Sequence, residues 1–181
     1  MVDKGQAALV HTKANSPTVT LPRVKALTTG TVPGFADIVL NFGLGGAEAI
    51  GESWLDQLAA RHKTMHFFGD DTWLRLFPTQ FARTDGTTSF YVHDTVEVDQ
   101  NVTRHVLHEL TQPDWDILVF HYLGLDHIGH LVGPASELMD RKLVEMDAVV
   151  GLVWETLKPA GSKRTLFVLC SDHGMTEVGL F

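Results

Sequence analysis

Carboxylate and imidazole side chains follow the two most apolar segments of the sequence. The segment 115–122 runs into Asp126-His127-Ile128-Gly129-His130, and the segment 164–170 runs into Ser171-Asp172-His173-Gly174. Asp and His are ligands that zinc takes in sites that keep an open position for chemistry. Asp126 and His130 are four residues apart, so a helical backbone places them on one face, close enough to share an ion. The pattern predicts a metal site built from Asp126, His130, Asp172 and His173.

Each pair has a structural interpretation as well as a chemical one. A single Asp-x-x-x-His occurs often by chance, and an Asp-His after a strand is commonly a cap or a turn. Asp70 and Asp71, after the segment 64–68, are interpreted as turn residues. Solvated or packing roles are expected for a further set of histidines: His11, His62, His66, His93, His105, His108 and His121. Two Asp/His pairs at two strand ends favour the metal site over coincidence.

A hydroxyl nucleophile is the third part that a two-metal phosphoryl-transfer site can use. Thr20 is the candidate, since it precedes Leu21-Pro22 at a predicted helix start. A helix N-terminus offers free N–H groups and partial positive charge, which favour phosphate. The alternative is that Thr20 only caps the helix.

Alternating helices and apolar strands must position these residues. The periodicity predicts helices over 20–32, 47–62, 99–110 and 136–157, strands over 64–68, 115–122 and 164–170, and irregular chain over 33–46 and 71–87. Strands that are apolar throughout belong to parallel sheets covered by helices on both faces. The predicted fold is therefore a three-layer α/β/α domain with a mainly parallel sheet. In such sheets ligands bind beyond the carboxyl ends of the strands.

Composition excludes several classes of protein. The chain has 181 residues, enough for one domain, and a net charge of −8, which argues against nucleic acid as a partner. No stretch reaches the roughly 18 apolar residues that span a membrane. The lone Cys170 is expected to be a buried strand residue. Asn101-Val102-Thr103 is a glycosylation sequon, and Asn101 is expected to face solvent near the start of its helix.

Three motifs in chain order are similar to those of the alkaline-phosphatase superfamily, in its phosphodiesterase and phosphotransferase branch. They are Pro17-Thr18-Val19-Thr20-Leu21-Pro22, Gly124 to His130 with Gly133-Pro134, and Ser171-Asp172-His173-Gly174-Met175. The intervening Phe68-Gly69-Asp70-Asp71-Thr72-Trp73 and the run from Glu97 to His105 resemble the GPI ethanolamine phosphate transferases, most closely the type 2 group.

The resemblance implies a role for each motif. Thr20 would be the nucleophile, Asp126 and His130 would bind one divalent cation, and Asp172 and His173 with Thr20 would bind a second, both zinc. The implied donor is phosphatidylethanolamine, and the implied acceptor is a mannose, the second, of the GPI glycolipid. The family works at the endoplasmic reticulum membrane with a lumenal catalytic domain. A small membrane-protein subunit is a further implied partner.

The chain also departs from the family pattern. The family carries a metal-binding Asp upstream of the threonine and a His-Gly shortly after the last motif, and neither has a counterpart here. We therefore expect residues 1–181 to be a partial catalytic domain, truncated at both ends and separated from its membrane region. Such a piece would bind metal weakly and have little activity.

Two other functions stay open at this point. One is a soluble metal-dependent phosphodiesterase or sulfatase-like hydrolase of the same fold, in which water accepts the transferred group. The other is a catalytically incomplete lumenal domain that only binds. Arg23 stands where phosphodiesterase relatives carry Asn, which argues against a generic nucleotide phosphodiesterase.

Overall fold

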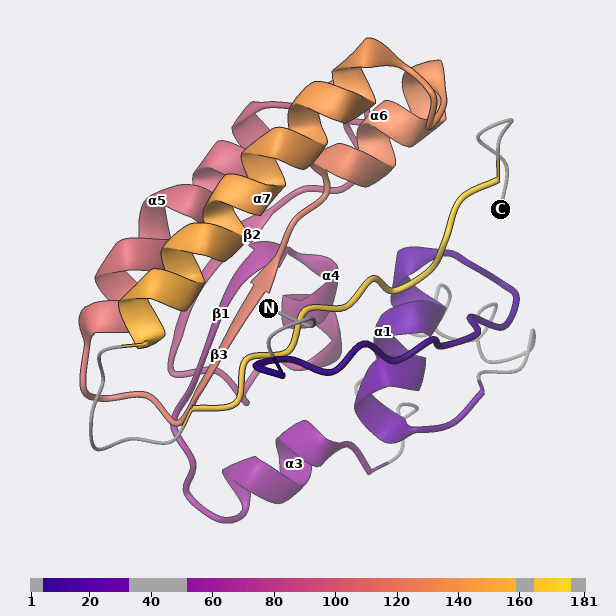
Figure 1. Cartoon of the computed structure of the whole chain (residues 1–181). Helices are drawn as coiled ribbons and strands as arrows, with labels where there is room; N and C mark the ends of the chain where they lie inside the picture. Colours follow the sequence, from indigo (N-terminus) through magenta and orange to yellow (C-terminus); the bar gives the residue numbers. More distant parts are fainter. Residues whose placement is uncertain (1–4, 33–51, 159–164, 177–181) are drawn as a thin grey trace.

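A parallel sheet lies between two groups of helices in the computed structural model, which describes residues 5–32, 52–158 and 165–176 (Figure 1). The sheet has the order β2-β1-β3 and consists of β1 (Met65–Asp70), β2 (Arg83–Thr87) and β3 (Ile117–His121). The helices are α1 (Thr20–Thr29), α3 (Trp54–Ala59), α4 (Thr72–Leu76), α5 (Glu97–Thr111), α6 (Gly124–Val132) and α7 (Glu137–Leu157). The predicted α/β class with a parallel sheet is confirmed.

The strand order explains why helices cover both faces. The chain steps from β1 to β2 through α4, and then back past β1 to β3 through α5. Right-handed connections in opposite directions place their helices on opposite faces of the sheet. Accordingly α5 packs on one face, with α7 against it, while α1, α3 and α4 gather on the other (Figure 1).

The central strand β1 forms the middle of the core, and all six of its residues are buried. Phe67 stacks on Trp73 with ring centroids 5.3 Å apart, and this face of the sheet forms one apolar cluster of Val24, Leu55, Met65, Phe67, Trp73, Leu76 and Phe77. On the opposite face, α5 buries Val102 and Val106 completely. The core therefore fixes β1 relative to the helices on both sides.

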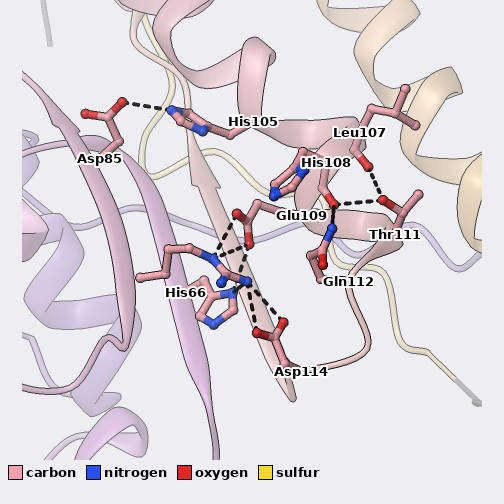
Figure 2. A network of polar contacts seen from close by, with 10 residues as sticks. His66, Asp85, His105, Leu107, His108, Glu109, Thr111, Gln112 and Asp114 are labelled. Atoms are coloured by element: carbon pink, nitrogen blue, oxygen red, sulfur yellow. Dashed lines mark hydrogen bonds and ion pairs between the residues drawn. The ribbon is translucent and has the colours of Figure 1, made fainter.

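A polar network ties α5 to the amino-terminal ends of β1 and β2 (Figure 2). The buried carboxylate of Glu109 lies 3.0 Å from His66 Nδ1 and 3.0 Å from Arg83 Nε. Arg83 also reaches Asp114, at 3.0 Å. Nearer the middle of the sheet, His105 Nε2 lies 2.8 Å from Asp85 Oδ2. The contacts of Glu109 and Arg83 lie at the opposite end of the sheet from the predicted site.

The structure corrects part of the prediction that residues 71–87 are irregular, because α4 and β2 form within this range, while residues 77–82 between them are irregular as predicted. The sequence of β2, Arg-Thr-Asp-Gly-Thr, has no apolar residue, and Asp85-Gly86 suggests a turn. Pairing with β1 supplies the backbone hydrogen bonds that make it a strand, with Asp85 opposite Phe68 and Gly86 opposite Gly69.

Two further predictions need correction. The described part of the helix predicted over 47–62 begins only at Trp54, because Ser53 and Asp56 form a capping box there; residues 47–51 lie outside the described residues, as do 33–46. Residues 165–170, predicted as a strand, pair with no strand among the described residues, and Cys170 is exposed rather than buried. An apolar run becomes a strand only where a neighbouring strand takes its backbone hydrogen bonds.

Candidate functional site

The carboxyl ends of the three strands lie in one row. Asp70 is in register with Thr87, and Gly69 is in register with His121, so β1, β2 and β3 end together. After β3 the chain passes through Leu123 directly into α6. The predicted ligands of the Asp126 motif are therefore placed at this edge, where ligands bind in parallel sheets.

The helix α6 places Asp126 and His130 on one face. Asp126 lies in the first turn, and His130 follows one turn later, with its Nε2 3.5 Å from Asp126 Oδ2. The sequence spacing predicted this neighbourhood, and the structure supplies the helix that creates it. Both side chains are about 30% exposed, which leaves them accessible from solvent.

The segment that carries Asp172 and His173 lies against α6. His173 Nε2 is 3.5 Å from Asp172 Oδ2 and 3.8 Å from Asp126 Oδ1, so it connects the two pairs. Met175 packs so closely on Gly129 that a Cβ at residue 129 would overlap its sulfur. The structure therefore brings Asp126, His130, Asp172 and His173 together from motifs more than forty residues apart.

The ring of His173 is oriented by a backbone contact. Its Nδ1 lies 3.0 Å from the carbonyl oxygen of Gly174. A carbonyl oxygen can only accept, so Nδ1 carries the proton and donates it. The Nε2 lone pair is then left facing Asp126 and Asp172, which is the tautomer that a metal-binding histidine needs.

The spacing of the four side chains fits shared cations. Two ligands of one tetrahedral zinc, each about 2.1 Å from the ion, lie about 3.4 Å from one another. The Asp126–His130 and Asp172–His173 atom pairs are both separated by 3.5 Å. Asp126 Oδ1 is buried without a hydrogen-bond partner in the described ranges, as expected of an oxygen whose partner is an ion. Within residues 5–32, 52–158 and 165–176, however, no three such side chains are arranged to hold one ion together.

Burial shifts the pKa values of two side chains, Asp126 and His121, at the carboxyl edge of the sheet. It raises the pKa of Asp126 above its ordinary value, with a smaller contribution from Asp172, and His130 and His173 act in the opposite direction. Burial also lowers the pKa of His121, against the charges of Asp70, Asp172 and Asp126. A cation at this position would offset the mutual repulsion of the carboxylates.

Thr20 is the first residue of α1 but does not cap it. The N-cap is Val19, whose own side chain makes no capping hydrogen bond, so the alternative reading of Thr20 as the cap is wrong. Arg23, one turn further along α1, donates from Nε to the backbone oxygen of Asp172 at 2.7 Å. Residues three apart on a helix lie on one side, so Thr20 belongs to the side of α1 that contacts the Asp172 segment. Its role as the nucleophile stays a prediction.

Sequence reasoning missed three buried groups at the same edge. Asp70, interpreted as a turn residue, ends β1 with 0% exposure, and its Oδ2 has no hydrogen-bond partner among the described residues. Thr87 Oγ1, at the end of β2, is likewise unpartnered in the described part of the chain. His121 accepts a hydrogen bond at Nδ1 from Trp73 Nε1, at 2.9 Å. The available signals were that Asp70 stands two residues beyond the predicted strand 64–68 and that His121 is a polar residue near the end of the predicted strand 115–122.

The structure also gives the surroundings of Arg23 and Asn101, two residues that the sequence analysis singled out. Arg23 is only 9% exposed, and its one described side-chain contact is the carbonyl oxygen of Asp172. Asn101 lies in the second turn of α5, which begins at Glu97, and it is half-buried rather than fully solvent-facing. Whether Asn101 carries a glycan stays a prediction.

Three known proteins that are similar to this chain have closely matching names. The chain is 50% identical to GPI ethanolamine phosphate transferase 2 of Aspergillus oryzae over 99% of its length, covering 22% of that protein. It is 50% identical to the protein of the same name from Schizosaccharomyces pombe over 92% of the chain, covering 23% of the relative. It is 48% identical to human GPI ethanolamine phosphate transferase 2, catalytic subunit, over 99% of the chain, covering 18% of the relative.

The chain thus spans about a fifth of the length of these curated relatives. No solved structure matches it. Among the described residues, no helix combines the length and apolar character needed to cross a membrane. Residues 4–179 match the family described as type I phosphodiesterase / nucleotide pyrophosphatase, which covers nearly all of the sequence. The chain belongs to the type I phosphodiesterase / nucleotide pyrophosphatase family.

Proposed function

We propose that this chain is part of the catalytic domain of a transferase that moves ethanolamine phosphate onto a GPI glycolipid. The donor is phosphatidylethanolamine, and the acceptor is a hydroxyl of the second mannose. The observation that carries the proposal is the convergence of Asp126, His130, Asp172 and His173 at the carboxyl edge of the sheet. The names of the relatives supply the substrate class.

Two divalent cations, which we propose to be zinc, would neutralise the anionic phosphodiester and lower the pKa of the attacking hydroxyl. Asp126 and His130 would hold one of them. Asp172 and His173, with Thr20, would hold the other. The buried Oδ1 of Asp126, which has no hydrogen-bond partner within the described part of the chain, and the oriented Nε2 of His173 support this assignment.

The reaction has two displacements at phosphorus. In the first, Thr20 Oγ bonds to the phosphorus of the donor, the bond to the diacylglycerol oxygen breaks, and that oxygen takes a proton as diacylglycerol leaves. In the second, the mannose hydroxyl gives up its proton and bonds to the same phosphorus, while the bond to Thr20 Oγ breaks and Thr20 regains a proton. We propose that the first-turn N–H groups of α1 and the guanidinium of Arg23, which already contacts the Asp172 segment, bind the phosphoryl oxygens.

The surroundings of the reaction follow from its substrates. Both donor and acceptor are lipids, so we propose that the domain works at the membrane of the endoplasmic reticulum, on its lumenal side. A further part of the protein would hold the domain at that membrane, and a small membrane-protein subunit would be its partner.

Transfer of label tests the proposal directly. Microsomes from cells that express the protein would be given phosphatidylethanolamine labelled in the ethanolamine, with and without GPI acceptor. The unsubstituted protein should label the glycolipid, and fragmentation by tandem mass spectrometry should place the group on the second mannose. When acceptor is withheld, label should accumulate on the protein itself.

Substitution of two threonines separates the nucleophile from its neighbour. Thr20→Val should lower transfer at least about 1000-fold and abolish labelling of the protein, because it removes the attacking oxygen. Thr18→Val, in the same motif, is the matched control and should retain activity. Free phosphoethanolamine formed equally well without acceptor would instead indicate a hydrolase. Equal transfer by the unsubstituted protein and Thr20→Val would contradict the proposal.

A further inference from the structure

The amino-terminal end of α6 is capped by a side chain from another helix. Leu123, the N-cap of α6, makes no side-chain cap of its own. Asp99 of α5 instead accepts hydrogen bonds at Oδ1 from the N–H groups of Leu123 and Gly124, at 3.1 and 2.9 Å. Asp99 is 0% exposed, so water cannot substitute for it in these contacts. The first N–H groups of a helix need such an acceptor, since they have no partner within the helix.

A buried lysine from a third helix neutralises this carboxylate. Lys142 of α7 places its Nζ 3.0 Å from Asp99 Oδ2 and 2.9 Å from Glu145 Oε2, and its side chain is only 4% exposed. Burial by itself lowers the pKa of Lys142, but the adjacent carboxylates of Glu145 and Asp99 outweigh it and raise the pKa above its ordinary value. Lys142 is therefore charged at neutral pH and balances the buried carboxylate.

Gly124 makes the close approach of the three helices possible. A Cβ at residue 124 would overlap Asp99 Oδ2 and would lie 3.1 Å from Lys142 Cε. No side chain fits between α6 and the Asp99–Lys142 ion pair. The pair thus holds the backbone at the first residue of α6 in one place.

The position of that first residue determines where the candidate ligands point. Asp126 follows Gly124 by two residues within the first turn of α6, and His130 lies one turn beyond it. Each residue of an α-helix turns the chain by about 100°, so fraying or a shift of one residue at Gly124 would turn Asp126 away from His173.

We propose that Asp99 and Lys142 form a positioning pair, which holds α6 so that Asp126 and His130 are oriented to bind a divalent cation. This inference rests on the proposed function for the identity of the ligands. Neither Asp99 nor Lys142 contacts the cation or the substrate, and their effect passes through the backbone of α6. Groups that hold metal ligands in place commonly change metal affinity 10- to 100-fold when they are removed.

A second buried ion network on α5 provides a matched control. Glu109 is 1% exposed and pairs with His66 and Arg83 at the amino-terminal ends of β1 and β2 (Figure 2), whereas α6 follows the carboxyl end of β3. Glu109→Gln should therefore lower the melting temperature without changing the orientation of Asp126. A purely structural role for Asp99 would make Asp99→Ala and Glu109→Gln behave alike.

The experiment measures zinc affinity by titration calorimetry, together with hydrogen exchange of the α6 amides, in the 181-residue chain and its variants. Asp99→Ala should weaken zinc binding about 10- to 100-fold and speed exchange at Asp126 to Ile128. Glu109→Gln should change affinity by less than about threefold. The double variant Asp99→Asn with Lys142→Met should restore most of the affinity, because the Asn oxygen still accepts from the amides and no buried charge is left unpaired.

Several results would overturn the inference. One is unchanged exchange in α6 for Asp99→Ala. Another is faster exchange with unchanged zinc affinity, and a third is an equal loss of affinity in Glu109→Gln. Failure of the proposed function is detected separately, by comparing the unsubstituted chain with Asp126→Asn. If the two bind zinc with equal affinity, Asp126 is not a ligand. That result would show that the ligand assignment is wrong, and the positioning role that depends on it would be wrong as well.

Discussion

Replacing Gly129 by alanine tests how the segment of Asp172 and His173 is held against α6. In the structure, a Cβ at residue 129 would overlap the sulfur and the terminal methyl group of Met175. The α6 backbone cannot yield easily, because Gly129 is buried and lies in mid-helix. The flexible Met175 side chain must move instead, and it lies only two residues beyond His173. The substitution should therefore displace His173 from Asp126.

The expected changes in folding stability nearly cancel. Alanine is favoured over glycine within a helix by about 0.8–1.0 kcal/mol. Against this, Met175 loses its packing on α6. A fully buried Met contributes about 1.5–3 kcal/mol, and Met175 is half-buried, so roughly 1 kcal/mol is lost. The free energy of unfolding should stay within about 1 kcal/mol of its original value, while zinc affinity falls about tenfold or more.

Urea denaturation and zinc titration of the same four proteins provide the assay: the unsubstituted chain, Gly129→Ala, Met175→Ala and the double variant. The smaller side chain of Met175→Ala makes room for the new methyl group, so the double variant should recover zinc affinity relative to Gly129→Ala. The coupling between the two positions should lie in the range of about 0.5–3 kcal/mol that residues in contact show. Additive effects on zinc affinity, or an unchanged affinity in Gly129→Ala, would refute the reasoning.

Two further predictions concern Cys170 and Tyr122. Cys170 is exposed, so a thiol reagent should label it readily in the folded chain, although more slowly than in urea because partial burial raises the pKa of the thiol; strong protection without denaturant would contradict its exposure. Burial raises the pKa of Tyr122 to about 12, despite its hydrogen bond to Thr103. Its folded-state pKa lies above the unfolded value of about 10, so this group stabilises the fold below pH 10 and loses up to roughly 2–3 kcal/mol as pH rises to 12. Tyr122→Phe should reduce the fall in the free energy of unfolding between pH 10 and 12, measured by urea denaturation. An unchanged dependence on pH in this variant would contradict the role of Tyr122.

The sequence by itself determined the elements whose pattern is local. The helical spacing of apolar residues predicted α5 and α7, and the apolar runs predicted β1 and β3, because periodicity and composition reflect which faces are buried. The helix predicted over 20–32 from its Thr-Leu-Pro start forms as α1, and it ends earlier, at Gly30, with the left-handed backbone that favours glycine. The spacing of Asp126 and His130 was equally readable, since one helical turn separates them.

Only the tertiary structure decided which segments become strands and which polar groups are buried. The polar β2 is a strand because β1 lies beside it, whereas the apolar run 165–170 has no partner among the described residues and forms none. The contact of His173 with Asp126 and the cap that Asp99 provides for α6 join residues more than twenty positions apart. No local pattern records such contacts, because they depend on how the sheet and three helices pack. The residue types that carry the predicted chemistry could be read from the sequence. The distances between them depend on packing.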